Sequence, residues 1–355
     1  MSGCVRPPEP VDAPLVPEQV VPRLRMPRKG PEVFLLAPQL AATAAGQRGV
    51  FTAAQAYDAG YTHPEVQRLR MLNTLISVRR GVYAVAYDWR RLTPSDRHLG
   101  ELVALRLVLK EPATISHVSA GAVHGLSLLA PDLATVHVTR GGLSASRLEA
   151  GVHHHAAALR ERDVVSIDGW QVTNLARTGI DIARECELAS GVAALDSVLR
   201  LGTPAAQLTE VLISCSSWPG ARMAGRALGL ADGRADNAGE SWSRVELTRH
   251  GEPPSDIQRK MYDDDGLIGI ADFVWDPERV VGELDGRLKY KVAEGAATQE
   301  AGEIVWAEKR REDRIRFLGY EVVRWVYADL YHPERLAARV RQALARGAAR
   351  RRTHP

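Results

Sequence analysis

The sequence predicts a multidomain protein of mixed α+β and α/β class, and three observations lead to this prediction. Its 355 residues suffice for about two or three domains. Near the N-terminus, two helix-capping patterns precede two runs of β-forming residues, as in a small helical domain with a hairpin. The last third orders its predicted elements as α-β-β-β-α-β-α, which is typical of a mixed sheet flanked by helices.

The composition is that of a globular protein without a strong global charge. Hydrophobic residues make up 45% and charged residues 25%, while the formal net charge is only +3. Any nucleic-acid contact must therefore come from local basic patches. The cysteines, Cys4, Cys186 and Cys215, are odd in number and scattered, which argues against a disulfide framework and favours the cytoplasm. The sequence has no apolar run of the roughly 18 residues that a membrane helix needs.

Shifts in composition and pattern predict the domain boundaries. Residues 1–32 are expected to form a disordered tail, because prolines from Pro7 to Pro27 interrupt every regular element. The other predicted segments are a winged helix-turn-helix at 33–92, a middle α/β region at 93–215, a linker at 216–236, a mixed-sheet domain at 237–346 and a basic tail at 347–355.

The winged helix-turn-helix is predicted from two capping boxes and a hairpin. Thr52 to Gln55 and Thr62 to Glu65 each place Ser/Thr three residues before Gln/Glu, and two β-like runs follow around Arg79-Arg80-Gly81. Its second helix would present side chains to a DNA major groove, and its wing would contact phosphate or the minor groove. The candidate DNA contacts are Gln67, Arg68, Arg70, Asn73, Arg79 and Arg80. A protein-interaction module with solvated arginines remains an alternative.

The middle region alternates predicted helices and strands and contains three adjacent histidines. Helices are expected at 96–109, 116–124, 178–184 and 191–201, and strands at 135–139 and 163–167. His153-His154-His155 suggests a metal cluster, but consecutive strand residues point to opposite faces. Three adjacent histidines cannot all bind one ion from a regular strand, so a surface strand is expected at this position.

The final domain carries acidic residues where apolar strands end. Glu283 and Asp285 share a strand face about 6.6 Å apart, and a hairpin through Asp276-Pro277 would bring Asp272 to the same edge. Clustered carboxylates repel one another, and a hard divalent cation is their usual counterion. The pattern predicts a metal-assisted phosphodiester cleft. A polar strand end with solvated acids is the alternative.

The apolar stripe of the helix predicted at 294–318 also contains an arginine. The stripe consists of Ile304, Ala307, Ile315 and Leu318, within about 80° of one another at 100° per residue. Arg311 lies inside it, and a buried arginine needs an acidic or phosphate partner. We expect Arg311 to point at the carboxylates or the scissile phosphate, unless it snorkels to the edge of the stripe.

The last third combines several motifs in one order. They are Gly239-Glu240-Ser241, Asp272, Glu283-Leu-Asp285-Gly286, Glu308-Lys-Arg310-Arg311-Glu-Asp313 and Gly319-Tyr320-Glu-Val-Val-Arg324. In this order, residues 237–345 resemble the Vsr-like (very-short-patch-repair-like) branch of the PD-(D/E)XK nuclease superfamily. The resemblance implies a restriction-endonuclease-like mixed sheet flanked by helices, with Mg²⁺ or Mn²⁺ as cofactor.

The same resemblance implies roles for individual residues. Asp272 and Glu283 would hold the metal ion, and Glu240 would complete its shell through water or a second ion. The superfamily usually has a lysine two residues after the acid, where this chain has Asp285. The Vsr-like branch also lacks that lysine. Lys289 has the strand parity to substitute for it, and Gln258 on the preceding strand could position the attacking water.

The first two thirds carry a different set of motifs. They are Gly81-Val-Tyr83, Ser116-His-Val-Ser-Ala120 with Gly125-Leu126, and Ala176-Arg177-Thr178. Residues 33–210 thereby resemble the AbiEi family, the antitoxin half of an abortive-infection toxin–antitoxin pair. The resemblance implies operator DNA binding, repression of its own operon and a cognate toxin as protein partner.

Together these observations predict a metal-dependent DNA endonuclease with a DNA-binding N-terminal half and a role in phage defence. The four acids favour this function, because unpaired buried charge is costly to keep on a mere scaffold. The low net charge and the missing lysine favour the alternative, an AbiEi-type repressor whose nuclease-like domain is non-catalytic. A repair nickase acting on mismatched DNA is a third hypothesis.

Overall fold

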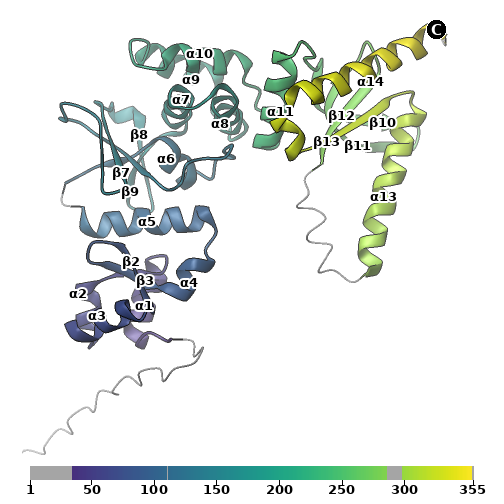
Figure 1. Cartoon of the computed structure of the whole chain (residues 1–355). Helices are drawn as coiled ribbons and strands as arrows, with labels where there is room; N and C mark the ends of the chain where they lie inside the picture. The colour runs from purple at the N-terminus through teal and green to yellow at the C-terminus, as the bar shows by residue number, and fades with distance from the viewer. Residues whose placement is uncertain (1–33, 110, 286–297, 354–355) are drawn as a thin grey trace, which may run out of the picture.

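The computed structural model describes residues 34–109, 111–285 and 298–353, with side chains of the last segment described from residue 306. It confirms the coarse class, because helices and three sheets alternate along the chain (Figure 1). The predicted 1–32 tail and Lys289 lie outside the described residues. Among the described helices, none combines the length and apolar character required to cross a bilayer.

The N-terminal unit is a three-stranded sheet covered by three helices. Its elements are α1 (Pro38–Gly46), β1 (Val50–Thr52), α2 (Ala53–Asp58), α3 (His63–Met71), β2 (Leu75–Arg79) and β3 (Val82–Val85). The strands pair antiparallel in the order β1-β3-β2. Both predicted capping boxes form, with Thr52 and Gln55 starting α2 and Thr62 and Glu65 starting α3. These caps satisfy free backbone N–H groups and fix where the two helices begin.

The middle unit is built on a six-stranded mixed sheet. The helices before and within it are α4 (Ala86–Arg91), α5 (Pro94–Val108) and α6 (His117–Val123). The strands are β4 (Thr114–Ile115), β5 (Val136–Arg140), β6 (Arg147–Glu149), β7 (Val152–Ala156), β8 (Val164–Ile167) and β9 (Trp170–Thr173), with the short helix η1 (Glu161–Asp163). They run in the order β6-β7-β5-β4-β9-β8. α5 lies between this sheet and the N-terminal unit (Figure 1).

A helical layer follows the sheet, and it changes one predicted boundary. Its helices are α7 (Leu175–Glu185), α8 (Leu188–Arg200), α9 (Ala205–Ser214) and α10 (Ala221–Leu230). The prediction of a linker at 216–236 was wrong, because α10 occupies much of it and buries Ala224 and Ala227 against the neighbouring helices. Besides glycine, α10 contains alanine, leucine, methionine and arginine, which are strong helix formers, and its buried alanines allow close helix packing.

The C-terminal unit is a four-stranded mixed sheet with helices on both faces. Its elements are α11 (Ala238–Arg249), β10 (Asp256–Asp263), β11 (Gly266–Trp275), β12 (Val280–Asp285), α13 (Thr298–Phe317), β13 (Glu321–Val326), η2 (Tyr327–Tyr331) and α14 (Pro333–Thr353). The strand order is β10-β11-β12-β13, with β13 parallel to β12. α11 and α14 pack against Phe273 and Trp325 on one face, and Ile315 of α13 packs on the other.

The predicted basic tail is the last part of α14. The helix continues to Thr353, and its arginines bind the sheet: Arg346 and Arg350 pair with Glu321. Gly347 permits this crossing, because a Cβ there would lie 2.0 Å from the carbonyl oxygen of Glu278. The expectation of a separate tail from residue 347 was therefore wrong up to Thr353, and the last two residues lie outside the described part.

Candidate functional site

Asp272 and Glu283 lie side by side where the ladder between β11 and β12 ends. The last paired residues are Phe273 and Gly282, so the next pair along the two strands is Asp272 and Glu283. Beyond this point the Asp272 carboxylate, not a backbone carbonyl, accepts the Leu284 N–H at 2.9 Å. The hairpin thus brings the two acids to one sheet edge, as the sequence predicted.

Glu240 joins them from the first turn of α11. Asn237 caps this helix through its side chain, which fixes Glu240 with its carboxylate toward the sheet. Gln258 on β10 donates from Nε2 to Glu240 at 2.8 Å and to Asp272 at 3.3 Å. One amide group therefore connects the two acids.

Gln258 reaches this position through an unusual backbone conformation. Its φ is +50°, in the left-handed region that non-glycine residues rarely adopt. The regular pairing of β10 and β11 skips it, because Ile257 pairs with Phe273 and Arg259 pairs with Ala271. Such strain costs free energy and is concentrated at functional sites.

Burial raises the pKa values of two of the three acids, Glu240 and Glu283. Glu240 is only 5% exposed, and burial together with the nearby Asp272 charge raises its pKa to about 7. Burial also raises the pKa of Glu283 to about 7, although Arg311 and Arg324 oppose that rise. Carboxyl groups that titrate near neutrality for these reasons are typical of sites that hold a cation or transfer protons.

Two arginines complete the cluster from the opposite side. Arg311 on α13 donates to Glu283 from both terminal nitrogens and to the Ile270 carbonyl at 3.0 Å. Arg324 on β13 pairs with Glu283 at 2.9 Å. Glu308 on α13 contacts both arginines, and Glu312 lies 3.2 Å from Arg324. Asp285 is more remote, at 4.0 Å from Arg324.

The structure places Arg311 where the helical stripe predicted it, although the stripe itself is incomplete. Ile315 is buried and Leu318 is partly buried, but Ala307 is exposed and the side chain of Ile304 lies outside the described part. In Figure 1, α13 extends past the end of the sheet, which agrees with the exposure of Ala307. The Arg311 side chain passes directly over Gly269. Any larger residue at position 269 would clash with it, because a Cβ there would lie 2.7 Å from Nε of Arg311.

The candidate DNA contacts of the N-terminal unit fall into two groups. Arg68, Asn73 and Arg80 are exposed. Arg70, in contrast, turns toward its own domain, donating to Gln67 at 2.8 Å and lying over the Tyr83 ring.

Arg79 lies differently from the expectation for a wing residue. It donates to the carbonyl oxygens of Glu101 on α5 and Ala150 beside β7, and burial lowers its pKa. These hydrogen bonds join the N-terminal unit to the middle unit. Arg80, the next residue, is exposed instead.

The prediction of a surface strand at the three histidines was right about the strand and wrong about the surface. They form β7, and His154 and His155 are each only 6% exposed. A histidine on β5 and a glutamate on α7 join two of them, a cluster that adjacency in sequence concealed. The available signal was alternation, since His153 and His155 share one face of the strand.

Comparison with known proteins gives relatives but no family. No protein-family model matches the chain. Two Mycobacterium tuberculosis proteins, MT2308 of strain CDC 1551 / Oshkosh and Rv2248 of strain H37Rv, both named as uncharacterized, are each 27% identical over 276 residues. These matches span 77% of this chain and 93% of each relative. The crystal structure of the Rv2827c protein from the same species covers 64% of this chain and 90% of its own, with 12% identity and a TM-score of 0.35, too weak a likeness for any argument.

Proposed function

We propose that the protein is a metal-dependent DNA endonuclease whose C-terminal domain has the PD-(D/E)XK nuclease fold of the Vsr-like branch. The observation that carries the proposal is the meeting of Glu240, Asp272 and Glu283 at one end of the sheet. α11, β11 and β12 each contribute one acid, and Gln258 adopts a strained backbone conformation to bridge two of them. A purely structural sheet end has no need of such an arrangement.

The donor set fits a hard divalent cation. Glu240 is buried, yet it accepts hydrogen bonds from neutral groups: the Asp236 N–H and the side chains of Asn237 and Gln258. A neutral shell leaves the charge of a buried carboxylate poorly compensated, as its raised pKa indicates. Oxygen ligands from one or two carboxylates, with water and phosphate, are the set that Mg²⁺ prefers.

Asp272 and Glu283 would hold the ion directly, and Glu240 would complete its shell through water. When bound, Mg²⁺ or Mn²⁺ would stabilise charge on the scissile phosphate and lower the pKa of the attacking water. Gln258 keeps Glu240 and Asp272 at a fixed separation and can orient a water between them. Arg311 and Arg324 are the groups that can transfer their hydrogen bonds from Glu283 to a phosphate oxygen.

The N-terminal unit would bring the protein to DNA as a winged helix-turn-helix. Its order of helices and strands, α-β-α-α-β-β, supports this assignment. On α3 and the turn that follows it, Arg68 and Asn73 are exposed and free of the inward contacts that Arg70 makes. Arg80 at the hairpin is exposed as well. These three residues are the proposed DNA contacts of this unit.

One observation favours the second candidate function, an AbiEi-type repressor or antitoxin with a non-catalytic nuclease-like domain. Glu283 already has two arginine partners, which neutralise the carboxylate that a metal ion would need. If that network is permanent, the cluster serves stability and the DNA-binding unit carries the function, with a cognate toxin as protein partner.

The deciding experiment measures nicking of supercoiled plasmid and cutting of single-stranded DNA with Mg²⁺ or Mn²⁺. Asp272→Asn and Glu240→Gln should each reduce cutting at least about 100-fold, the scale on which groups that stabilise transition-state charge act. Asp276→Asn is the matched control, because Asp276 is an exposed acid in the turn directly after β11, at the other end of the β11–β12 ladder, where it pairs with Arg259. It should cut like the wild type.

Metal-dependent cutting lost in both site variants and kept in the control would establish the carboxylate site. No cutting by wild type, together with salt-sensitive binding to the promoter of its own gene, would instead favour the repressor. Cutting that persists in both site variants would overturn the assignment of this cluster as the active site.

A further inference from the structure

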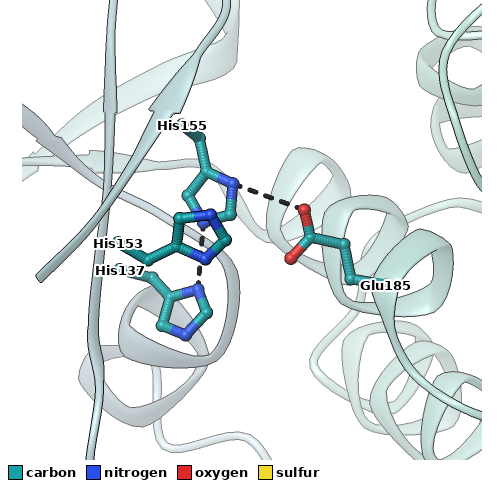
Figure 2. Close-up of side chains that lie close together, drawn as sticks. All are labelled: His137, His153, His155 and Glu185. Carbon is teal, nitrogen blue, oxygen red and sulfur yellow. Dashed lines mark hydrogen bonds and ion pairs between the residues drawn. The ribbon is translucent and has the colours of Figure 1, made fainter. Parts of the chain in front are cut away.

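The middle sheet gathers histidines that the carboxylate site does not use. β5 and β7 run parallel, with His137 opposite His153 and Thr139 opposite His155. Side chains two residues apart share a strand face, so His137, His153 and His155 all project from one face of the sheet. Figure 2 shows their three imidazole rings gathered on that face.

A carboxylate completes the group from the helical layer. Glu185 is the last residue of α7, and its Oε1 lies 3.3 Å from Nδ1 of His155 (Figure 2). The other ring nitrogen of His155, Nε2, lies 3.0 Å from Nδ1 of His137. One ligand atom from each of His137, His153, His155 and Glu185 lies within 4.8 Å of all the others. With metal–ligand bonds of about 2.0–2.2 Å, a single ion could therefore contact all four after side-chain shifts on the order of an ångström.

The protonation states suit a cation. Burial and the neighbouring histidines lower the pKa of His137 to about 3, and burial also lowers the pKa of His155. Partial burial would raise the pKa of Glu185, but hydrogen bonds from His117 and His155 outweigh it and hold that pKa well below its usual value. Neutral imidazoles and one ionised carboxylate are the forms in which these residues bind metal.

His117 supports the group from its outer side. Its ring stacks on that of His155 with centroids 3.6 Å apart, and its Nε2 lies 3.3 Å from Glu185. The residue is buried and has a left-handed backbone with φ of +52°. A partner that fixes a ligating carboxylate is the usual outer shell of a metal site, and strained backbone often accompanies function.

We propose that His137, His153, His155 and Glu185 bind one divalent transition-metal ion of the zinc class. Three imidazole nitrogens and one carboxylate oxygen match the four-ligand sets that proteins use for Zn²⁺, whereas Mg²⁺ prefers oxygen alone. A cavity of about 180 Å³, lined by His117, His137 and Glu185, gives an ion access to the group. The ion would join β5 and β7 to the end of α7. This proposed metal site does not depend on the proposed nuclease function.

The test uses full-length protein without an affinity tag, stripped with a chelator and then titrated with Zn²⁺ or Co²⁺ alone. We expect one equivalent of Zn²⁺ bound per chain, a visible Co²⁺ spectrum of tetrahedral type and a higher melting temperature with metal. His153→Gln and His155→Gln should abolish all three. His154→Gln is the matched control, because His154 lies on the same strand but projects to the opposite face.

Glu185→Gln tests whether a loss of Zn²⁺ binding results from misfolding, because the substitution lies outside both strands. It should weaken Zn²⁺ binding at least about tenfold, the lower limit for losing even an outer-shell partner. Absence of stoichiometric binding by wild type would overturn the proposal. So would binding that survives in folded His153→Gln and His155→Gln, or binding that His154→Gln abolishes equally.

Discussion

The carboxylate site of the C-terminal sheet and the histidine cluster of the middle sheet use the same architecture for opposite chemistry. Each lies where adjacent strands and a helix end meet, and each takes its proposed metal ligands from three elements. The first offers oxygen donors beside two arginines, and the second offers nitrogen donors around one carboxylate. The difference teaches that register positions a cluster, whereas residue type decides which ion it can hold.

The largest expected effect is that a substitution in either cluster removes the property of that cluster and leaves the property of the other unchanged. Asp272→Asn should abolish Mg²⁺-dependent cutting and leave Zn²⁺ stoichiometry at the wild-type value, because the clusters share no residue. His155→Gln should remove Zn²⁺ and leave cutting in excess Mg²⁺ within about threefold of wild type, within the usual context dependence of distant sites. Parallel metal analysis and plasmid nicking check both. Loss of both properties in either variant would show that the two regions are not independent.

The second effect concerns the arginine that distinguishes the carboxylate site. Arg311→Ala leaves Glu283 buried with one cationic partner fewer, so the free energy of unfolding in chelator should fall by about 1–3 kcal/mol. Mg²⁺ should recover part of this loss, because the vacated side of Glu283 becomes available to a cation. Denaturant titrations with and without Mg²⁺ provide the measurement.

Arg310→Ala is the control for Arg311→Ala, since Arg310 is exposed and its guanidinium stacks over Trp306. It should change stability little under either condition. If Mg²⁺ protects Arg311→Ala no more than wild type, Glu283 is not a cation ligand, and the repressor hypothesis gains support.

A third, smaller effect tests the bridging amide. Gln258→Asn keeps a residue that tolerates positive φ but shortens the side chain by one methylene, so it can no longer reach both Glu240 and Asp272. Cutting should fall by about tenfold, equivalent to roughly 1.4 kcal/mol of transition-state stabilisation. Lys260→Ala, an exposed change on the same strand, should have wild-type activity. A Gln258→Asn variant that cuts at the wild-type rate would reduce Gln258 to a structural role.

The smallest effect is a pair of opposite pH dependences in metal-free protein, beginning with the carboxylate site. Glu240 has a folded-state pKa of about 7 against 4.5 when unfolded, so the folded state binds more protons between these values. Its contribution to stability therefore improves as pH falls from about 7 to 4.5. Glu240→Gln should melt a few degrees higher than wild type at pH 8 and show no difference near pH 5.

The histidine cluster should respond in the other direction. His137 has a folded-state pKa of about 3 against 6.5 when unfolded, because burial and the facing His117, His153 and His155 oppose its protonation more than Glu185 favours it. The unfolded state then binds more protons, and stability is lost as pH falls below about 6.5. His137→Asn should flatten this acid dependence in melting curves recorded in chelator. A gain in melting temperature that grows toward the same end of the pH range in His137→Asn and in Glu240→Gln would contradict the contrast between the regions.

Sequence periodicity was sufficient for features set within one element. Strand alternation placed Glu283 beside the end of β11, helical spacing turned Arg311 toward the sheet, and capping boxes at Thr52 and Thr62 began the two short helices. Such features follow from residue spacing and local hydrogen bonding, which the chain carries wherever it folds. Composition was a less reliable guide to domain boundaries, because the Gly- and Ala-containing segment at 221–230, which resembles a linker, forms a helix.

Tertiary structure decided which elements meet. The pairing of His137 with His153 depends on the register of β5 and β7, and Glu185 reaches them only because α7 ends above that face. Likewise, Arg79 became a contact between units through the docking of α5, although its sequence context is that of an exposed turn. Register and docking result from many weak contacts between distant segments, and a one-residue slip would turn every histidine to the other face. Short-range patterns contain no record of those contacts.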